Sequence, residues 1–600
     1  MAINVSFNGA TIYKPGAYSK VSIDLSGGFP LSPTGLVAIL GEADAGAPGA
    51  SEVNIANNVF SPEQLPEIKA KYGRGPIVDA CNLLFAPGSD GAIPGGAQAI
   101  YIYKTNASVR ASLALAGSYG TVQAREWGVG GNRITLKITG SGATRNLTLS
   151  QKRDLLVETA TVGGNVLVTV TNATAGSTVS IDDNNVVLFN GTSSVSLPKA
   201  SFGSVADLAE AINLIPSWSA VLTAGQDSRQ SVNVLDHVSS LDAVSGAALK
   251  KDAAEVAAFF EASSIASLES GAKVGLPAAL AEAALSGGAK GATSTSEIVN
   301  ALSKFEKVRV NSVVPLMSRD ASDDAADGLT ESGSNYTIEG IHQAVKTHLS
   351  LMATTKKKSE RQGYLSLKAD YADCKQRAQD LAAARVQLAI QDVRQADSDG
   401  VIRWFQPWAA ACLLAGARGG SPIGLPMTNK YFNMSGIRQT GQAMSTAEAD
   451  IVIDFDPDTQ YDDAISSGIS FWERPQSGGF RLVVDNTTYG KDGNWVYNRA
   501  NVLYAADVLA YDFRNQLENL YVGVKNTVSA AEVKSTCESI LTTYLTQGIT
   551  VSTADAKNGF KQLVVQINGN TINVSVVVKL VEGIDFVLAD ITLQRAQQSA

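Results

Sequence analysis

The sequence has little cysteine, and the cysteines that it has are scattered. Cys81, Cys374, Cys412 and Cys537 lie far apart and form no CxxC motif and no cluster with histidine. We therefore expect buried, reduced thiols and not disulfides, which is the usual state of cysteine in proteins that fold in a cytoplasm.

An excess of positive charge and long apolar runs are also missing. The net charge of −9 and the isoelectric point near 5.1 argue against broad nucleic-acid binding, which needs a basic face to neutralise phosphates. The longest apolar run, residues 408–415, is far too short for a membrane span, and no cationic segment with an apolar core opens the chain. We expect neither a membrane-spanning helix nor a secretion signal.

Catalytic motifs are scarce. His237, His342 and His348 are the only histidines, and the last two lie six residues apart, on roughly opposite faces of one predicted helix. They predict ordinary packing or surface residues and not a metal pair. GxSxG, HExxH and Walker A patterns are absent. We therefore expect no enzyme, no catalytic residue, no cofactor and no metal site.

Three polar stretches remain as candidates for chemistry. The acidic residues within 320–327 miss the alternation of an EF-hand and predict a solvated loop. The three lysines of residues 356–358 predict a solvated segment, or a contact with an acidic partner or another subunit. Residues 485–489 follow a predicted strand, where α/β folds often have their sites, but no nucleophile with its base is near. A hydrolase or transferase at this strand end stays open as an alternative.

The sequence does contain enough apolar residues for several globular cores. Its 45% hydrophobic and 18% charged residues are typical of a folded chain, and 600 residues allow several domains. Strand-like and helix-like segments alternate before residue 105 and again after residue 307, which indicates an α/β arrangement. We expect strands at 36–41, 99–104, 308–314, 363–367, 386–393 and 480–485, and helices at 62–72, 77–85, 338–352, 371–383, 404–416, 502–520 and 533–544.

The segment between these two parts has a different composition. Residues 121–221 are rich in Thr, Val, Asn and Gly and predict a β-rich insertion, which also leaves a surface adhesin open as an alternative. Alanine dominates residues 241–303 and predicts short helices. We expect a discontinuous α/β (α+β) core domain with an inserted β-rich domain and strand-forming arms at both ends. The expected boundaries are 1–30 (N-terminal arm), 31–117 (first part of the core), 118–235 (β-rich insertion), 236–306 (alanine-rich helical segment), 307–582 (C-terminal core) and 583–600 (C-terminal arm).

Both ends of the chain are predicted to be strands. Residues 562–567 and 571–581 flank Asn568-Gly569-Asn570, a sequence that favours a tight hairpin. After Glu582-Gly583, residues 587–593 alternate apolar and polar side chains. Such a strand either folds back on its own sheet or is offered to another subunit, because an unpaired edge invites strand addition.

The N-terminal end repeats this pattern. Residues 3–7 and 21–25 alternate apolar and polar side chains, and a Pro-Gly turn lies between them. Gly27-Gly28 then predicts a hinge before the globular core. An arm of about thirty residues corresponds to one pair of turn-linked strands.

Several short motifs, in order along the chain, resemble the tail sheath proteins of contractile bacteriophages. Tyr13-Lys14-Pro15-Gly16-Ala17-Tyr18 is similar to the family's N-terminal proline-glycine-x-tyrosine signature, with Ala17 where valine is usual. Ala124-Arg125-Glu126-Trp127-Gly128 is similar to the start of its inserted domain. The segment 404–420, the strand 480–485 with Thr487-Thr488-Tyr489, and Asn498-Arg499 with the helix that follows complete the resemblance.

The resemblance implies a structural function. Family members stack as six-fold rings around an inner tail tube, and their terminal arms add strands to neighbouring subunits. It implies as partners the chain itself, the tail tube protein, and baseplate and terminator proteins, with no direct contact with nucleic acid and no membrane insertion. It implies a place in the virion tail after assembly in the host cytoplasm; the sheath of a bacteriocin or secretion particle is the neighbouring alternative.

The resemblance assigns roles to residues at both ends. The expected inter-subunit strand residues are Ile3, Val5, Phe7, Val21, Ile23, Leu25, Ile572, Val574, Val576, Val578, Val587, Ala589, Ile591 and Leu593, and the expected hinges are Gly27, Gly28 and Gly583.

Overall fold

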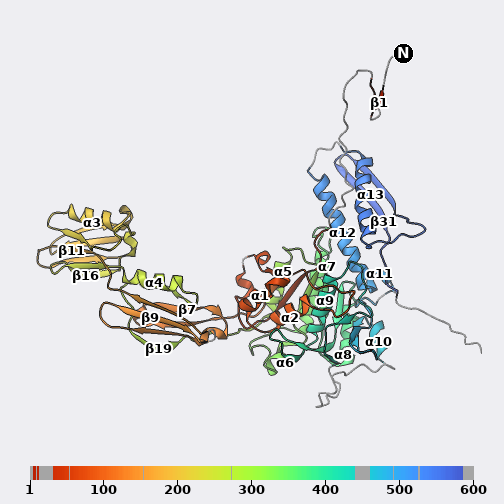
Figure 1. The fold of residues 1–600 in the computed structure, drawn as a ribbon, viewed down its shortest axis with the longest axis horizontal. Coiled ribbons are helices and arrows are strands. Elements are labelled where there is room, and N and C mark those ends of the chain that lie inside the picture. Colours follow the sequence, from red (N-terminus) through yellow and green to blue (C-terminus); the bar gives the residue numbers. More distant parts are fainter. Residues whose placement is uncertain are drawn as a thin grey trace, which may run out of the picture.

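A computed structural model of the chain describes residues 31–584, except 53, 153–154, 272, 440–459, 491, 493 and 524–527, together with the short strands β1 (Val5–Phe7) and β2 (Ala10–Ile12). Figure 1 shows a core of helices and strands in the middle, a β-rich insertion on one side, and a smaller unit from residues 500–584 on the other. None of the helices in these ranges is long and apolar enough to cross a membrane.

The core is built on a seven-stranded sheet with the order β27-β22-β21-β20-β3-β5-β4. Every neighbouring pair is parallel except β4 with β5. Strands from before residue 105 and from after residue 311 therefore lie side by side. The strands are β3 (Leu36–Gly41), β4 (Val59–Phe60), β5 (Ala99–Lys104), β20 (Ser312–Pro315), β21 (Gln362–Ser366), β22 (Val386–Ala389) and β27 (Ile469–Ser470).

Helices cover both faces of this sheet. Val37 and Ile39 of β3 join an apolar cluster with α1 (Leu65–Tyr72), α2 (Pro76–Phe85) and α9 (Trp408–Gly420). Residues 38 and 40 face the opposite way, toward α5 (Thr295–Phe305), α7 (Ile338–Met352) and α8 (Tyr371–Leu381). A Cβ on Gly416 of α9 would lie 2.5 Å from the carbonyl oxygen of Leu84, so glycine lets α9 pack closely on α2. Burial on both faces explains why these strands are continuous apolar runs.

The insertion has two separate apolar cores (Figure 1). The part nearer the core contains the sheets β10-β9-β8-β19 and β18-β7-β6 with helix α4, and the distal part contains the sheets β15-β11-β17 and β14-β13-β12-β16 with helix α3. The elements are β6 (Arg110–Leu115), β7 (Gly120–Trp127), β8 (Ile134–Thr139), β9 (Arg145–Gln151), β10 (Leu156–Val162), β11 (Val166–Thr171), β12 (Ser177–Ile181), β13 (Asn185–Asn190), β14 (Ser194–Pro198), α3 (Val205–Asn213), β15 (Ser219–Leu222), β16 (Val238–Asp242), β17 (Ala247–Lys250), α4 (Asp252–Ala262), β18 (Ala266–Glu269) and β19 (Leu280–Ala284).

Residues 236–306 differ from the expected alanine-rich helical segment. They contain α4 and α5, but also strands β16, β17, β18 and β19, which pair with β12, β11, β7 and β8. Alanine favours helices, but pairing with a neighbouring strand overrides this weak local preference. The sheets of the insertion therefore contain strands from both sides of the expected boundary at residue 235.

Two expected elements of the core are also corrected. Residues 386–393 form not one strand but β22 and then β23 (Gln391–Ala396), which belongs to a separate sheet with the order β24-β23-β26, where β26 is Gly436–Gln439. Trp404 lies in β24 (Ile402–Phe405) and not in the following helix. Pro407 is the residue before α9, and a proline without an N–H group suits the start of a helix but not a strand ladder.

The terminal unit consists of α12 (Ala500–Tyr521), α13 (Ala530–Thr546), β30 (Phe560–Asn568) and β31 (Thr571–Val578). Ser529 caps α13 through a reciprocal capping box with Glu532. The predicted C-terminal hairpin is confirmed, since β30 and β31 pair antiparallel from Asn568 opposite Thr571. Gly569 has a φ of +60°, the left-handed conformation that the predicted turn requires.

The N-terminal strands pair over a shorter distance than expected. Val5 lies opposite Ile12 and Phe7 opposite Ala10, so β1 pairs antiparallel with β2. A two-residue connection makes this hairpin the most local pairing that the chain can form. Ile3, Val21, Ile23, Leu25, Gly27, Gly28, Val587, Ala589, Ile591 and Leu593 lie outside the described residues.

Candidate assembly site

The β30–β31 sheet has one apolar face, which packs inside the subunit. Ile572, Val574, Val576 and Val578 alternate with exposed residues and point to the apolar cluster of α12 and α13. Because neighbouring residues of a strand point to opposite faces, the other face carries mainly polar side chains, such as Asn573 and Ser575. The side chains of these predicted strand residues therefore pack within the subunit. Only the backbone edges of the two strands could pair with a strand of another subunit.

Both strands have an edge without a partner in the described part of the chain. β30 and β31 pair with each other and with no further strand there. At the end of β31, the Lys579 N–H donates to the Gly559 carbonyl at 2.9 Å and the Val581 N–H donates to the Ile549 carbonyl at 3.2 Å. These bonds continue the pairing on the β30 side, so the opposite edge of β31 has exposed donors and acceptors.

Gly583, a predicted hinge, lies just beyond this sheet. A Cβ at this position would lie 3.0 Å from the Pro426 side chain, a tight contact that would require this ring to shift by a few tenths of an ångström. The neighbouring Ile584 is 85% exposed. A hinge function of Gly583 stays a prediction.

The polar strand end at residues 485–488 is buried and held by hydrogen bonds. Asp485 is 1% exposed and forms an ion pair with Arg418, whose Nη2 lies 2.6 and 2.5 Å from its two oxygens. The Met427 N–H donates to the same carboxylate at 3.0 Å, and the Gln387 side-chain amide donates at 3.2 Å. Because its oxygens accept all of these hydrogen bonds, the Asp485 carboxylate joins several segments of the core and is not placed to act as a base.

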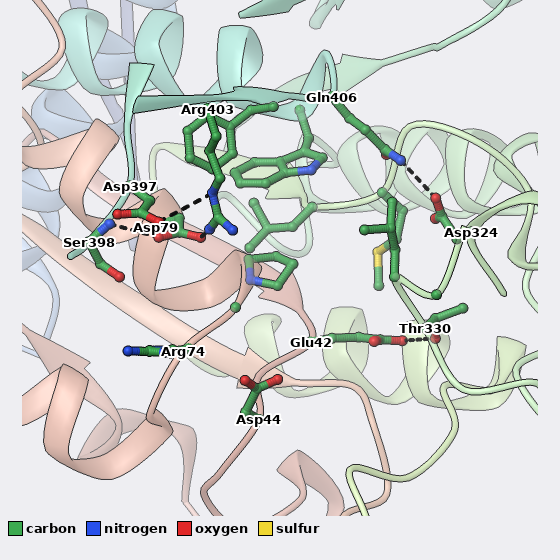
Figure 2. Close-up of a pocket in the computed structure, with 18 of the residues that line it drawn as sticks. Glu42, Asp44, Arg74, Asp79, Asp324, Thr330, Asp397, Ser398, Arg403 and Gln406 are labelled. Carbon is green, nitrogen blue, oxygen red and sulfur yellow. Dashed lines mark hydrogen bonds and ion pairs between the residues drawn. The ribbon is translucent and has the colours of Figure 1, made fainter. Parts of the chain in front are cut away.

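A cavity of about 590 Å³ lies at the carboxyl ends of β3 and β20 (Figure 2). Ligands of α/β proteins often bind at such strand ends. Trp404, Phe405 and Trp408 line this cavity together with apolar residues such as Leu316 and Met317 and with charged side chains from several loops. No histidine or cysteine is among the described residues that line the cavity.

The charges around this cavity are largely paired with each other. Arg403 pairs with the buried Asp79 and lies 3.5 Å from Asp397. Lys290 lies 3.0 Å from Glu42. Burial raises the pKa of Asp79, while its hydrogen bonds with Ser398 and the Arg403 charge oppose the rise. The paired charges therefore hold the loops around the cavity together, as Figure 2 shows for Arg403, Asp79 and Asp397.

The acidic stretch 320–327 is not the solvated loop that we expected. Residues 321–326 form the short helix α6 (Ala321–Ala326), and Asp324 is buried. Its Oδ1 lies 2.7 Å from Arg319 Nε, and Oδ2 accepts a hydrogen bond from the Tyr336 hydroxyl at 2.8 Å. The two donors lie only 5 and 12 residues from Asp324 in the sequence, and the fold of the chain around α6 brings both onto one carboxylate.

His342, His348 and the four cysteines are buried packing residues. His342 lies 3.1 Å from the Ser366 carbonyl oxygen, and burial lowers its pKa to about 3. His348 contacts Arg361 at 3.3 Å, and burial, together with the Arg361 charge, lowers its pKa to about 4. All four cysteines are buried and free. No metal-binding cluster of His, Cys, Asp and Glu occurs within the described ranges.

These features define a mixed α/β protein whose terminal sheet has edges open to further strands. The chain is 24% identical over 565 residues to the tail sheath protein of Bacillus phage SP01, an alignment that covers 89% of both proteins. The resemblance to tail sheath proteins inferred from the sequence motifs is thereby confirmed.

One solved structure also supports the fold. A sheath tail protein from Desulfitobacterium hafniense matches with a TM-score of 0.50 at 14% identity, over 92% of this chain and 93% of that one. A sheath tail protein from Listeria innocua matches with a TM-score of 0.48 at 12% identity, over the same shares of the two chains. No family model matches the chain.

Proposed function

We propose that this chain is the structural subunit of a contractile tail sheath. It polymerises as stacked six-fold rings around an inner tail tube and is held there in an extended, metastable state. Baseplate triggering then lets the lattice contract and drive the tube through the host envelope for genome ejection. The similarity to the Bacillus phage protein over 89% of the chain supports this class of function.

The observation that carries the proposal is the contrast between two sheets. The central sheet ends in β4 and β27, edge strands of only two residues each, and short edge strands resist unwanted pairing. The terminal sheet has strands of nine and eight residues, and in the described part of the chain each has an open edge. Packing on α12 and α13 stabilises this two-stranded sheet within the subunit, and its open edges can still accept further strands.

We infer that the chain ends supply those strands to neighbouring subunits. The donated residues are Ile3, Val5 and Phe7 or Val21, Ile23 and Leu25 from the N-terminal arm, and Val587, Ala589, Ile591 and Leu593 from the C-terminal arm. Contacts in which one end of a subunit binds a different surface of the next do not close on themselves and generate helical assemblies. Strand pairing then keeps neighbours connected while the subunits move, and Gly27, Gly28 and Gly583 absorb the change of angle.

In this proposal, contraction is driven by the free-energy difference between the extended and the contracted lattice and needs no cofactor or nucleotide. A kinetic barrier separates the extended lattice from a contracted one with larger contacts, and the trigger lowers that barrier. The partners are other copies of the chain, the tube protein, and the baseplate and terminator proteins. The place of action is the virion tail, assembled in the host cytoplasm.

The test is negative-stain electron microscopy of the purified chain and of two truncations. Wild-type protein should form striated tubes or short contracted sleeves. Variants lacking residues 2–24 or 585–600 should stay folded and soluble but form no tubes, because each lacks one donated strand. Normal tubes from either truncation would contradict the strand exchange, and secretion of a monomeric protein that binds cells would favour an adhesin instead.

A further inference from the structure

Asp512, in the middle of α12, is a fully buried carboxylate that holds three parts of the chain together. Its Oδ1 accepts hydrogen bonds from the backbone N–H and the hydroxyl of Ser32, at 2.7 and 2.6 Å. Its Oδ2 accepts from the Tyr544 hydroxyl of α13 at 2.7 Å and from the Gln516 side-chain amide at 2.5 Å. Hydrogen bonds to a buried carboxylate are among the strongest in proteins.

Ser32 stands where the predicted N-terminal arm joins the folded protein. Leu31, next to it, packs against the apolar cluster of the terminal unit. Only three residues, 33–35, separate Ser32 from β3. Since β3 lies between β20 and β5 in the central sheet, a pull on the arm would reach the middle of that sheet if nothing held Ser32.

We propose that Asp512 is a positioning residue that anchors the root of the N-terminal arm on the terminal unit. A force that a neighbouring subunit exerts on the arm is then transmitted from Ser32 to α12 and α13. It does not act on the strand pairing of β3. Both polar groups of Ser32 bind one carboxylate oxygen, while the other oxygen is fixed by Tyr544 and Gln516. The inference rests on the proposed function, because the arm carries load only in a polymer.

The anchor can be tested by hydrogen exchange of residues 36–41 in monomers and in assembled tubes. The variants are Asp512→Asn and Ser32→Ala, with Ser535→Ala, at an exposed position of α13, as the matched control. In tubes, we expect exchange of residues 36–41 to be about tenfold faster in Asp512→Asn and several-fold faster in Ser32→Ala than in wild type, as expected for lost charge-assisted hydrogen bonds. In monomers, Ser32→Ala, Ser535→Ala and wild type should exchange alike.

Each other outcome has a distinct meaning. Equal exchange in variant and wild-type tubes would overturn the anchor and leave the sheath proposal intact. An equal increase for Ser32→Ala in monomers and tubes would show ordinary stabilisation and would also overturn the anchor. If wild-type protein forms no tubes, the proposed function is wrong and this inference falls with it. Should Asp512→Asn fail to fold, Ser32→Ala alone decides, because it removes only one of the four hydrogen bonds.

Discussion

Replacing Val576 with proline should block the open edge of β31 without unfolding the protein. Lys579 and Val581 direct their N–H groups to the β30 side, as their bonds to Gly559 and Ile549 show. Alternate residues of a strand direct these groups to opposite sides, so the Val576 N–H points to the open edge. Proline removes this donor and places its ring where an added strand would lie, while the bonds to β30 remain.

The expected size of the effect follows from the hydrogen bonds at that edge. An added strand along β31 would bond to Ile572, Val574, Val576 and Val578, and each net bond contributes about 0.5–1.5 kcal/mol. Proline removes one bond and weakens its neighbours, so we expect a loss of at least about 1.4 kcal/mol per contact, or about tenfold in the concentration needed for assembly. The folded monomer should lose only about 1 kcal/mol, because Val576 is half-buried and strand preferences span about that range.

The assay is sedimentation of polymer over a range of protein concentrations, with electron microscopy of the pellet and thermal unfolding of the monomer. Val576→Thr is the matched control, since threonine keeps the branched shape and the backbone N–H. If Val576→Pro is folded but polymerises at the same concentration as Val576→Thr, the edge of β31 is not an assembly surface.

Two further predictions concern the insertion and acid stability. Replacing residues 110–288 with Asn-Gly should leave a core that folds and polymerises. Val109 and Ala289 exchange backbone hydrogen bonds of 3.0 and 3.2 Å and form a pair that a two-residue turn can close. Loss of the thermal unfolding transition in calorimetry would contradict the prediction that the core folds without the insertion. For His342, burial lowers the pKa to about 3, so between this value and about 6.5 the unfolded chain binds more protons. The free energy of unfolding therefore decreases as the pH is lowered through this range, by up to about 1.4 kcal/mol per pH unit. In urea titrations between pH 4 and 7, His342→Gln should have a smaller slope of stability against pH, and a slope equal to that of wild type would refute the assignment.

The sequence predicts the local elements of the core well, because their signals are local. Buried parallel strands such as β3 and β5 are short apolar runs, and α7 matches its predicted range. Asn568-Gly569 predicts the terminal hairpin through the turn that it requires. The strands between 236 and 306 were missed because alanine favours helices, and only their partners in the insertion decide otherwise.

The polar groups that hold the core and the arm in place could not be predicted. Arg418 and Asp485 are 67 residues apart in the sequence, and Ser32 and Asp512 are 480 apart. Neither pair has a spacing or motif that links its members, since the fold alone brings them together. The sequence predicts a polar strand end at Asp485, but only its ion pair with Arg418 shows that the carboxylate is structural.

Helix α12 is fixed on both sides, which limits where a subunit can bend. One face carries Leu509, Phe513 and Leu517 into the apolar cluster of the terminal unit. A second face carries polar residues three and four positions apart, a spacing that places them in one row along the helix. The contacts of this row with the core are Asp507 with Arg385 at 2.7 Å, the ring of Tyr511 with Arg309 at 3.8 Å, Arg514 with Glu360, and Glu518 with Lys358 at 3.9 Å.

A single continuous helix that is packed on one side and paired along the other joins the core and the terminal unit into one body. Within that body, a change of angle between the core and the terminal unit would break several of these contacts at once, because packed elements do not deform gradually. In the proposed lattice, we therefore expect movement between neighbouring subunits to be taken up outside α12, in the segments that lead to the two chain ends. This is where the predicted hinges at Gly27, Gly28 and Gly583 lie, on the far side of the Ser32 anchor at one end and just beyond the terminal sheet at the other.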